Sequence, residues 1–236
     1  MRVVLASSNK GKLEELNRLL SGLHLNLVTQ SELGVTPCEE PFGTFLENAL
    51  AKARHASACT GLPALADDSG LIVEELIDWA GIRSARLYQD WLDQQISEVS
   101  AAHTKNSLQA DEWPEFHRRY QAGQISLDRA NLLCLIHLLK AKRHATTAEN
   151  SPPIAARFVA VFAFLRSADD PLPLIGQGQW LGELVLTPRG ENGHGYDPIF
   201  FDATRGRTAA EMSLEEKNTC SHRARAAQAF CAAFQT

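Results

Sequence analysis

Residues 7–12, which read Ser-Ser-Asn-Lys-Gly-Lys, carry hydroxyl, amide and ammonium groups that could bind phosphate. They lie between a short apolar run and a helical pattern, where the first N–H groups of a helix and its dipole favour an anion. Asn9 could bond phosphate oxygens, and Lys12 supplies a point charge. The segment is not a P-loop, because Ala6 and Leu13 stand where that motif requires glycine and a hydroxyl. Taken alone, it is more often an ordinary polar turn.

A second cation-rich segment, residues 217–223, lies near the other end of the chain. Lys217 and Ser221 stand at positions i and i+4 and so share one face of a predicted helix. His222 and Arg223 lie beside them, and donors of this kind suit the carbonyl oxygen of a 6-oxo purine. The amino group of adenine would face the same donors, a buried mismatch that costs about 1–3 kcal/mol. The two segments together indicate a substrate with a polyphosphate group.

Four carboxylates could supply hard oxygen ligands for Mg²⁺, namely Asp67, Asp68, Glu39 and Glu40. Mg²⁺ usually takes one or two carboxylates and completes its shell with water and substrate phosphate. Asp68 follows a predicted strand at residues 63–67, where a sheet can deliver a side chain into a cleft. In isolation, adjacent carboxylates are more often a helix cap or solvated charge.

The late run at residues 193–200, Gly-His-Gly-Tyr-Asp-Pro-Ile-Phe, offers groups that could read a base. His194 is a planar side chain between two glycines, and Asp197 could accept from a ring N–H or hydroxyl. Lys52 and Arg86 could offset phosphate charge, although such a lysine is more often a solvated surface residue.

These blocks, in this order, closely resemble the house-cleaning inosine/xanthosine triphosphate pyrophosphatase family. The matching blocks are residues 6–12, 66–70, 193–200 and 208–225, and the resemblance covers residues 2–87 and about 128–230. It implies an α/β fold that is elongated and two-lobed with a mixed sheet, and an active site in the cleft between the lobes. It also implies a homodimer.

The resemblance implies a Mg²⁺-dependent reaction in which water attacks the α-phosphorus and releases pyrophosphate. Asp68 would be the general base, and Asp68 with Glu40 or Glu39 would hold Mg²⁺; the sequence does not decide between the two glutamates. The predicted substrate-binding residues are Ser7, Ser8, Asn9, Lys10, Gly11, Lys12, Asn48, Lys52, Ser69, Arg86, His194, Gly195, Tyr196, Asp197, Lys217, Ser221, His222 and Arg223.

Three features depart from the pattern of that family. Ser8 stands where glycine often occurs, and His194 stands where phenylalanine usually packs against the purine, so base affinity could depend on pH. Residues at about 88–127 have no counterpart and form a predicted, mainly helical insertion in an otherwise single domain across residues 1–236. A surface helical hairpin, a changed dimer interface, a lid and a partner surface all remain open for this insertion.

The elements that must position these groups follow from hydrophobic periodicity. We expect strands at residues 2–7, 25–28, 63–67 and 157–165, a turn at 67–70, and a hairpin around 176–183. Helices are expected at 11–20, 44–60 and 128–140, with residues 213–234 mostly helical. Thr44 and Glu47 predict the start of the second helix. Strands and helices that alternate early, followed by a strand cluster, favour an α/β protein with a mixed sheet.

The bulk composition limits the partners. A formal net charge of −5 argues against general nucleic-acid binding, which depends on many cations. We find no signal-peptide core and no membrane-length apolar run, so we expect a cytoplasmic protein without a membrane partner. Five cysteines without CxxC spacing indicate free thiols.

The predicted function is hydrolysis of ITP, dITP and XTP to the monophosphate and pyrophosphate. One alternative is a pyrophosphatase for other modified nucleotides, because His194 and the insertion could shift specificity. Another is an inactive nucleotide-binding regulatory module, against which the intact Lys12, Asp68, Lys217 and His222 argue. The sequence gives no preference among ITP, dITP and XTP.

Overall fold

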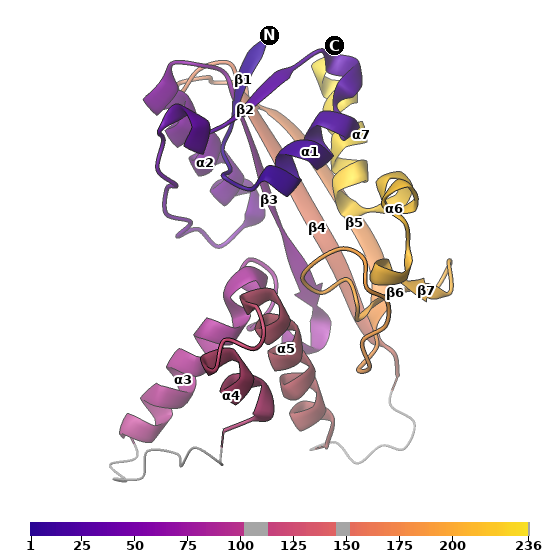
Figure 1. Cartoon of the computed structure of the whole chain (residues 1–236). Helices are drawn as coiled ribbons and strands as arrows, with labels where there is room; N and C mark the ends of the chain where they lie inside the picture. Colours follow the sequence, from indigo (N-terminus) through magenta and orange to yellow (C-terminus); the bar gives the residue numbers. More distant parts are fainter. Residues whose placement is uncertain (102–112, 145–151, 236) are drawn as a thin grey trace. The chain divides into compact units, whose positions relative to one another are not determined.

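The computed structural model describes residues 1–101, 113–144 and 152–235. Its strands form a seven-stranded sheet in the order β2-β1-β3-β4-β5-β6-β7 (Figure 1). The strands are β1 (Arg2–Leu5), β2 (Asn26–Thr29), β3 (Ala64–Val73), β4 (Ile154–Leu165), β5 (Leu174–Leu184), β6 (Phe200–Asp202) and β7 (Arg207–Thr208). Strand β1 pairs in parallel with β2 and β3, whereas β6 pairs antiparallel with β5 and β7. The predicted α/β fold with a mixed sheet is confirmed.

The α-helices of the described ranges are α1 (Lys10–Leu19), α2 (Phe45–Thr60), α3 (Leu87–Ala101), α4 (Glu115–Gln121), α5 (Leu127–His144), α6 (Leu214–Cys220) and α7 (His222–Phe234). The predicted start of α2 is confirmed, because the Thr44 hydroxyl oxygen accepts from the Glu47 N–H at 3.2 Å. The expected C-terminal helix is divided at Ser221, whose hydroxyl caps α7 by accepting from the Ala224 N–H. Of the helices described, none combines the length and apolar character that crossing a membrane requires.

The chain divides into two compact units. Unit 1 comprises Met1–Ser69, Phe158–Trp180 and Glu215–Thr236, and unit 2 comprises Gly70–Arg157 and Leu181–Leu214. The predicted position of the active site, in a cleft between two lobes, stays a prediction.

Helices cover both faces of the sheet in unit 1. Val3 and Leu5 of β1 pack with Leu16 of α1 and Phe230 of α7 in one buried cluster. Val4 and Ala6, which alternate with them, pack with α2 residues such as Ala53 in a second cluster. The buried, near-continuous apolar sequence of β1 follows from this double cover.

The turn predicted at residues 67–70 is wrong, because β3 runs without interruption from Ala64 to Val73. Asp67 and Asp68 resemble turn residues in sequence, but each is paired with a cation, so a buried strand can contain both. The uninterrupted strand matters for function, because successive side chains of a strand point to opposite faces of the sheet.

The hairpin predicted around residues 176–183 is also wrong, because β5 is one strand from Leu174 to Leu184. Its glycines serve close packing instead of a turn. A methyl group at Gly176 would overlap the Ala226 carbonyl oxygen of α7, and one at Gly178 would overlap the His222 carbonyl oxygen.

The predicted insertion at about 88–127 includes most of α3 and all of α4, while residues 102–112 lie outside the described residues. Its aromatic side chains pack together in unit 2: the ring of Trp113 stacks on His117 at 4.2 Å between centroids. The hydroxyl of Tyr88 lies 2.8 Å from Nδ1 of the same histidine. That this segment is an insertion stays a prediction.

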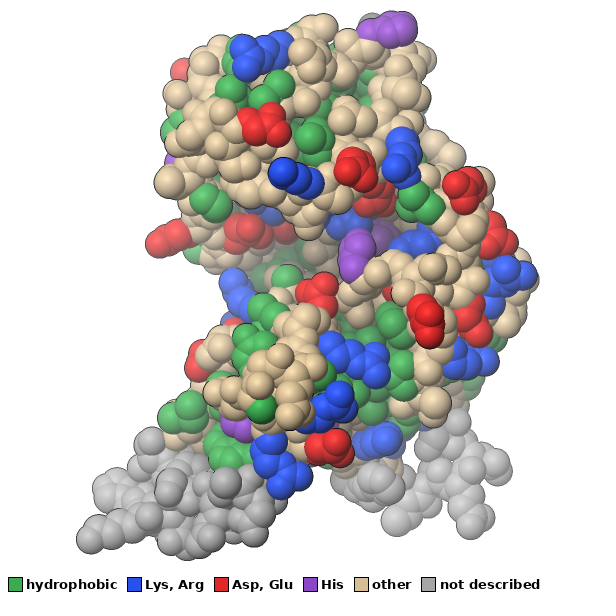
Figure 2. Space-filling view, viewed as in Figure 1, with side chains coloured by type: hydrophobic (Ala, Val, Ile, Leu, Met, Phe, Trp, Pro, Cys, Tyr) green, Lys and Arg blue, Asp and Glu red, His purple; other side chains and the backbone are tan. Residues whose placement is uncertain are grey.

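Both signs of charge occur on the surface. On the face seen in Figure 2, Lys and Arg side chains are interspersed with Asp and Glu. All five cysteines are free thiols, as the sequence predicted.

Candidate active site in unit 1

The phosphate-suited loop leads directly from β1 into α1. The Asn9 side chain caps the helix, with its Oδ1 accepting from the Lys12 N–H at 3.1 Å, and the Ser7 hydroxyl oxygen accepts from the Asn9 N–H at 3.1 Å. These bonds fix the turn and the direction of the first helical N–H groups. Ser8, Lys10 and Gly11 are exposed in the same turn.

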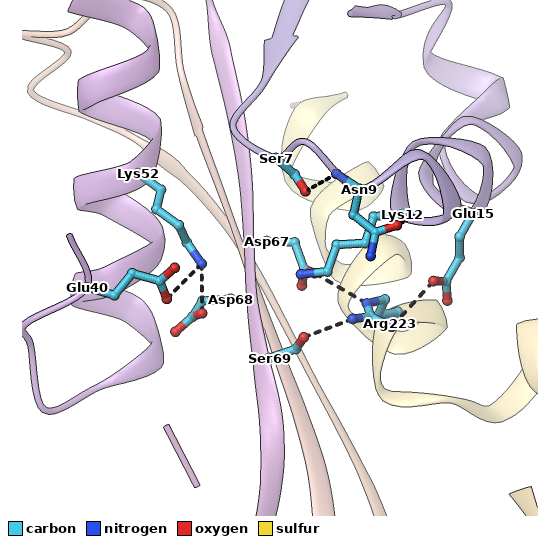
Figure 3. A network of polar contacts seen from close by, with 10 residues as sticks. All are labelled: Ser7, Asn9, Lys12, Glu15, Glu40, Lys52, Asp67, Asp68, Ser69 and Arg223. Atoms are coloured by element: carbon cyan, nitrogen blue, oxygen red, sulfur yellow. Dashed lines mark hydrogen bonds and ion pairs between the residues drawn. The ribbon is translucent and has the colours of Figure 1, made fainter. Parts of the chain in front are cut away.

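The two adjacent aspartates of β3 point to opposite faces of the sheet. Figure 3 shows Asp67 and Ser69 directed toward α1 and α7, and Asp68 directed toward α2. From the sequence, both aspartates were candidate metal ligands. The structure instead gives them different partners and different surroundings.

On the α2 side, one ammonium group joins two carboxylates. Lys52 Nζ lies 2.7 Å from Asp68 Oδ1 and 3.3 Å from Glu40 Oε2. Burial raises the pKa of Asp68, with Glu40 and Asp67 adding to the effect and Lys52 opposing it. Burial lowers the pKa of Lys52, but the neighbouring carboxylates outweigh it, so the pKa is raised overall.

On the other face, Asp67 is the centre of a buried ion-pair network (Figure 3). Its Oδ2 lies 2.8 Å from Lys12 Nζ and 3.3 Å from Arg223 Nε. Arg223 also donates to Ser69 Oγ at 2.9 Å and to Glu15 Oε2 at 3.4 Å. Burial disfavours the charged form of Asp67, yet Lys12 and Arg223 outweigh it and hold the pKa well below its usual range.

A pocket of about 270 Å³ lies beside the loop. Its lining comprises the predicted residues Ser7, Ser8, Asn9, Lys12, Glu40 and Lys52, together with Ala6, Gln30, Pro37, Cys38 and Asp67. A cavity of this size with two ammonium groups suits part of a polyphosphate rather than an apolar ligand.

Sequence reasoning missed Gln30 as a lining residue. It follows β2, which is parallel to β1, and the carboxyl ends of parallel strands meet at one edge of a sheet. The sequence predicted these strands but not their order, and the amide itself belongs to no recognisable motif.

The structure separates the two candidate metal-binding glutamates. Both glutamates are exposed, but Glu40 lines the pocket and pairs with Lys52, whereas Glu39 is not among the lining residues described. Asn48 fixes the loop that carries them, because its amide bonds both the N–H and the C=O of Phe42. That pairing gives Asn48 a structural task beside its predicted substrate contact.

The C-terminal predicted residues lie on α6 and α7. The imidazole of His222 is buried and stacks on Phe158, with ring centroids 4.8 Å apart. Lys217 is half-buried on α6, and the hydroxyl of Ser221 serves as the cap of α7. His222 and Arg223 are the first two residues of α7, directly after this cap.

The remaining predicted residues belong to unit 2. The turn at residues 193–197 is fixed by a hydrogen bond from the His194 N–H to Asp197 Oδ2 at 2.9 Å, and Gly195 has a φ of +58°. Tyr196 is buried and donates to the Ser84 carbonyl at 2.6 Å, so its hydroxyl holds the turn. Arg86 is exposed, 3.6 Å from Asp90, and His194 is exposed as well.

The chain is similar to several known proteins along nearly its whole length. The dITP/XTP pyrophosphatase of Bordetella pertussis is 45% identical over 225 residues, covering 95% of this chain and 87% of the relative. The dITP/XTP pyrophosphatase of Burkholderia pseudomallei is 43% identical, covering 98% and 92%. The HAM1 protein of Coxiella burnetii superposes with a TM-score of 0.75 at 36% identity, covering 100% of this chain and 98% of that structure. A sequence model of the Ham1 family matches residues 3–117 and 111–233, so the chain belongs to the Ham1 family.

Proposed function

We propose that this chain hydrolyses deaminated purine nucleoside triphosphates, dITP, XTP and ITP, to the monophosphate and pyrophosphate. The observation that carries the proposal is the buried carboxylate of Asp68, which pairs with Lys52, one of two lysines that line the pocket with Lys12. Relatives that cover almost the whole chain are named dITP/XTP pyrophosphatases, which supports the same substrates.

In the proposed reaction, water attacks the α-phosphorus and the bond between the α-phosphorus and the bridging oxygen breaks. Asp68 accepts the proton of the attacking water, and pyrophosphate leaves with the β and γ phosphates. A raised pKa makes Asp68 a stronger base than an ordinary aspartate. Lys12 and Lys52 offset the negative charge of the phosphates.

Mg²⁺ is the metal we propose for this site. Glu40, in the loop before α2, and Asp68, in β3, both contact the ammonium of Lys52, so two hard oxygen ligands meet at a position that attracts a cation. The donor set fits Mg²⁺, which usually takes one or two carboxylates. When bound, the metal would neutralise phosphate charge and orient the leaving group.

We propose that His222 and Arg223 select the base. Their N–H groups would donate to the 6-oxo group of hypoxanthine or xanthine and would oppose the 6-amino group of adenine. His222 is restricted by its stacking on Phe158, and Arg223 is restricted by hydrogen bonds to Asp67, Glu15 and Ser69. Restricted side chains favour such discrimination.

The test measures pyrophosphate release from dITP, XTP, ITP, dATP, dGTP and dTTP with Mg²⁺, and identifies the nucleotide product. Preference for dITP, XTP and ITP with a monophosphate product is expected. Preference for another nucleotide would change the proposed substrate but leave the proposed reaction unchanged. Nucleotide binding without turnover would favour the regulatory module instead.

From the family resemblance we also propose a homodimer that works in the cytoplasm. Sedimentation velocity at micromolar concentration checks the first point, and cell fractionation checks the second. A monomer at all concentrations would reject the dimer without affecting the proposed reaction.

A further inference from the structure

We propose that Asp67 is a positioning residue that holds Lys12 and Arg223 on one carboxylate oxygen and so sets the spacing between the phosphate end and the base end of the nucleotide site. The inference rests on the proposed function, which gives Lys12 to the phosphates and Arg223 to the base.

The geometry joins three elements at one atom. Oδ2 of Asp67, on β3, lies 2.8 Å from Lys12 Nζ of α1 and 3.3 Å from Arg223 Nε of α7. The side chain of Asp67 is 1% exposed, so both ion pairs are shielded from solvent and little weakened by salt. A shift of this carboxylate would move both cations together.

The two cations differ in how much they depend on Asp67. Arg223 is also anchored by Ser69 and Glu15. Among the residues that the structure describes, Lys12 has Asp67 as its one ion-pair partner. Loss of the carboxylate should therefore affect Lys12 more strongly than Arg223.

The second carboxylate oxygen of Asp67, Oδ1, is a further reason to assign Asp67 a role in the nucleotide site. Oδ1 is buried and has no hydrogen-bond partner within the described residues, and Asp67 lines the pocket. A buried acceptor without a partner is costly, and a donor that arrives with the nucleotide or its water would satisfy it.

The test is a double-mutant cycle of Asp67→Asn and Lys12→Met, with kcat and KM for dITP and dATP. The amide keeps the shape of the carboxylate but carries no charge. It places either its carbonyl oxygen or its N–H beside the two cations. We expect Asp67→Asn to lower kcat/KM for dITP by about 10²-fold, the usual scale for a misplaced group. In the Lys12→Met background the loss should be at least tenfold smaller, because the lysine to be positioned is gone. The ratio of dITP to dATP turnover should also fall in Asp67→Asn.

Equal losses in both backgrounds, or an unchanged ratio of dITP to dATP, would overturn the inference. Glu14→Gln is the control: it removes an exposed carboxylate of α1 that neighbours Glu15, so kcat/KM should change less than about twofold. Wild-type protein without dITP hydrolysis would reject the proposed function, whereas active wild type with an unaffected Asp67→Asn rejects this inference alone.

A second cycle applies if Asp67→Asn does not fold, as judged by circular dichroism. Lys12→Met and Arg223→Lys leave the carboxylate in place and disturb one partner each. If Asp67 links them, the double variant should lose at least tenfold less kcat/KM than the product of the two single losses. A loss equal to that product would overturn the proposal.

Discussion

At the scale of single residues, the two adjacent aspartates have different partners because a strand alternates its side chains. Asp68 has one lysine and a raised pKa, whereas Asp67 has two cations and a lowered one. Asp68→Asn should therefore lower kcat for dITP by about 10²–10⁴-fold, the usual contribution of a general base, and leave dITP binding measurable. Stopped-flow turnover and calorimetric binding check both parts; unchanged kcat would remove Asp68 as the base.

The pKa of Asp68 gives an independent check of the same assignment. Because burial raises it, the carboxyl should take up its proton, as the pH falls, at a pH above the ordinary aspartate value of about 3.9. Carboxyl carbon-13 titration of the substrate-free protein measures this, with Asp68→Asn used to assign the signal. A midpoint at or below the ordinary value would contradict the buried, lysine-paired environment.

Variants of Glu40 and Glu39 test which glutamate contributes to Mg²⁺ binding, because the two residues are adjacent and of the same type. Glu40→Gln removes a carboxylate that meets Asp68 at Lys52, so the Mg²⁺ concentration for half-maximal activity should rise about tenfold or more, as typical for loss of a metal-site partner. Glu39→Gln removes a neighbouring exposed charge and should leave that concentration within about twofold of wild type. Magnesium titrations of dITP hydrolysis compare the two, and equal responses would contradict the assignment to Glu40.

At the scale of elements, β5 and α7 are close because glycines face the helix. Gly178→Ala should push α7 away at His222 and Ala226, lower the unfolding free energy by about 1–3 kcal/mol, and reduce kcat/KM for dITP. Gly22→Ala is the control, since nothing lies within 4 Å of an added methyl group there. Urea unfolding and kinetics on both variants check the prediction, and equal stabilities would contradict close packing at Gly178.

The same elements show what sequence could predict. The start of α2 was predictable because Thr44 and Glu47 form a local signal, and the loop before α1 was predictable because its small residues precede a helical pattern. The strand at Asp67 and the single strand β5 were not. Their turn-like residues are stabilised by contacts with distant elements, to Lys12 and Arg223 in one case and to α7 in the other.

The candidate site was partly predictable for the same reason. Charge and motif identified Lys12, Asp68 and Arg223, whereas the task of Asp67 depends on which face of β3 it occupies. Gln30 carries no charge and belongs to no motif, so burial beside the loop was needed to identify it.

At the scale of the whole molecule, the charge balance separates a nucleotide from a nucleic acid as ligand. Net charge is −5, and cations are interspersed with carboxylates on the face in Figure 2, while the pocket of unit 1 concentrates Lys12 and Lys52. Affinity for a nucleic acid depends on many cations that neutralise successive phosphates, whereas a triphosphate needs a few at one place. An excess of 30-base-pair DNA or of RNA should therefore leave the rate of dITP hydrolysis unchanged at about 150 mM salt, a concentration that still permits non-specific binding by basic proteins. Steady-state kinetics with and without the competitor measure this, with pyrophosphate as the control that should inhibit. Inhibition by DNA that weakens steeply with added salt would contradict the prediction, because it would require a basic surface elsewhere on the molecule.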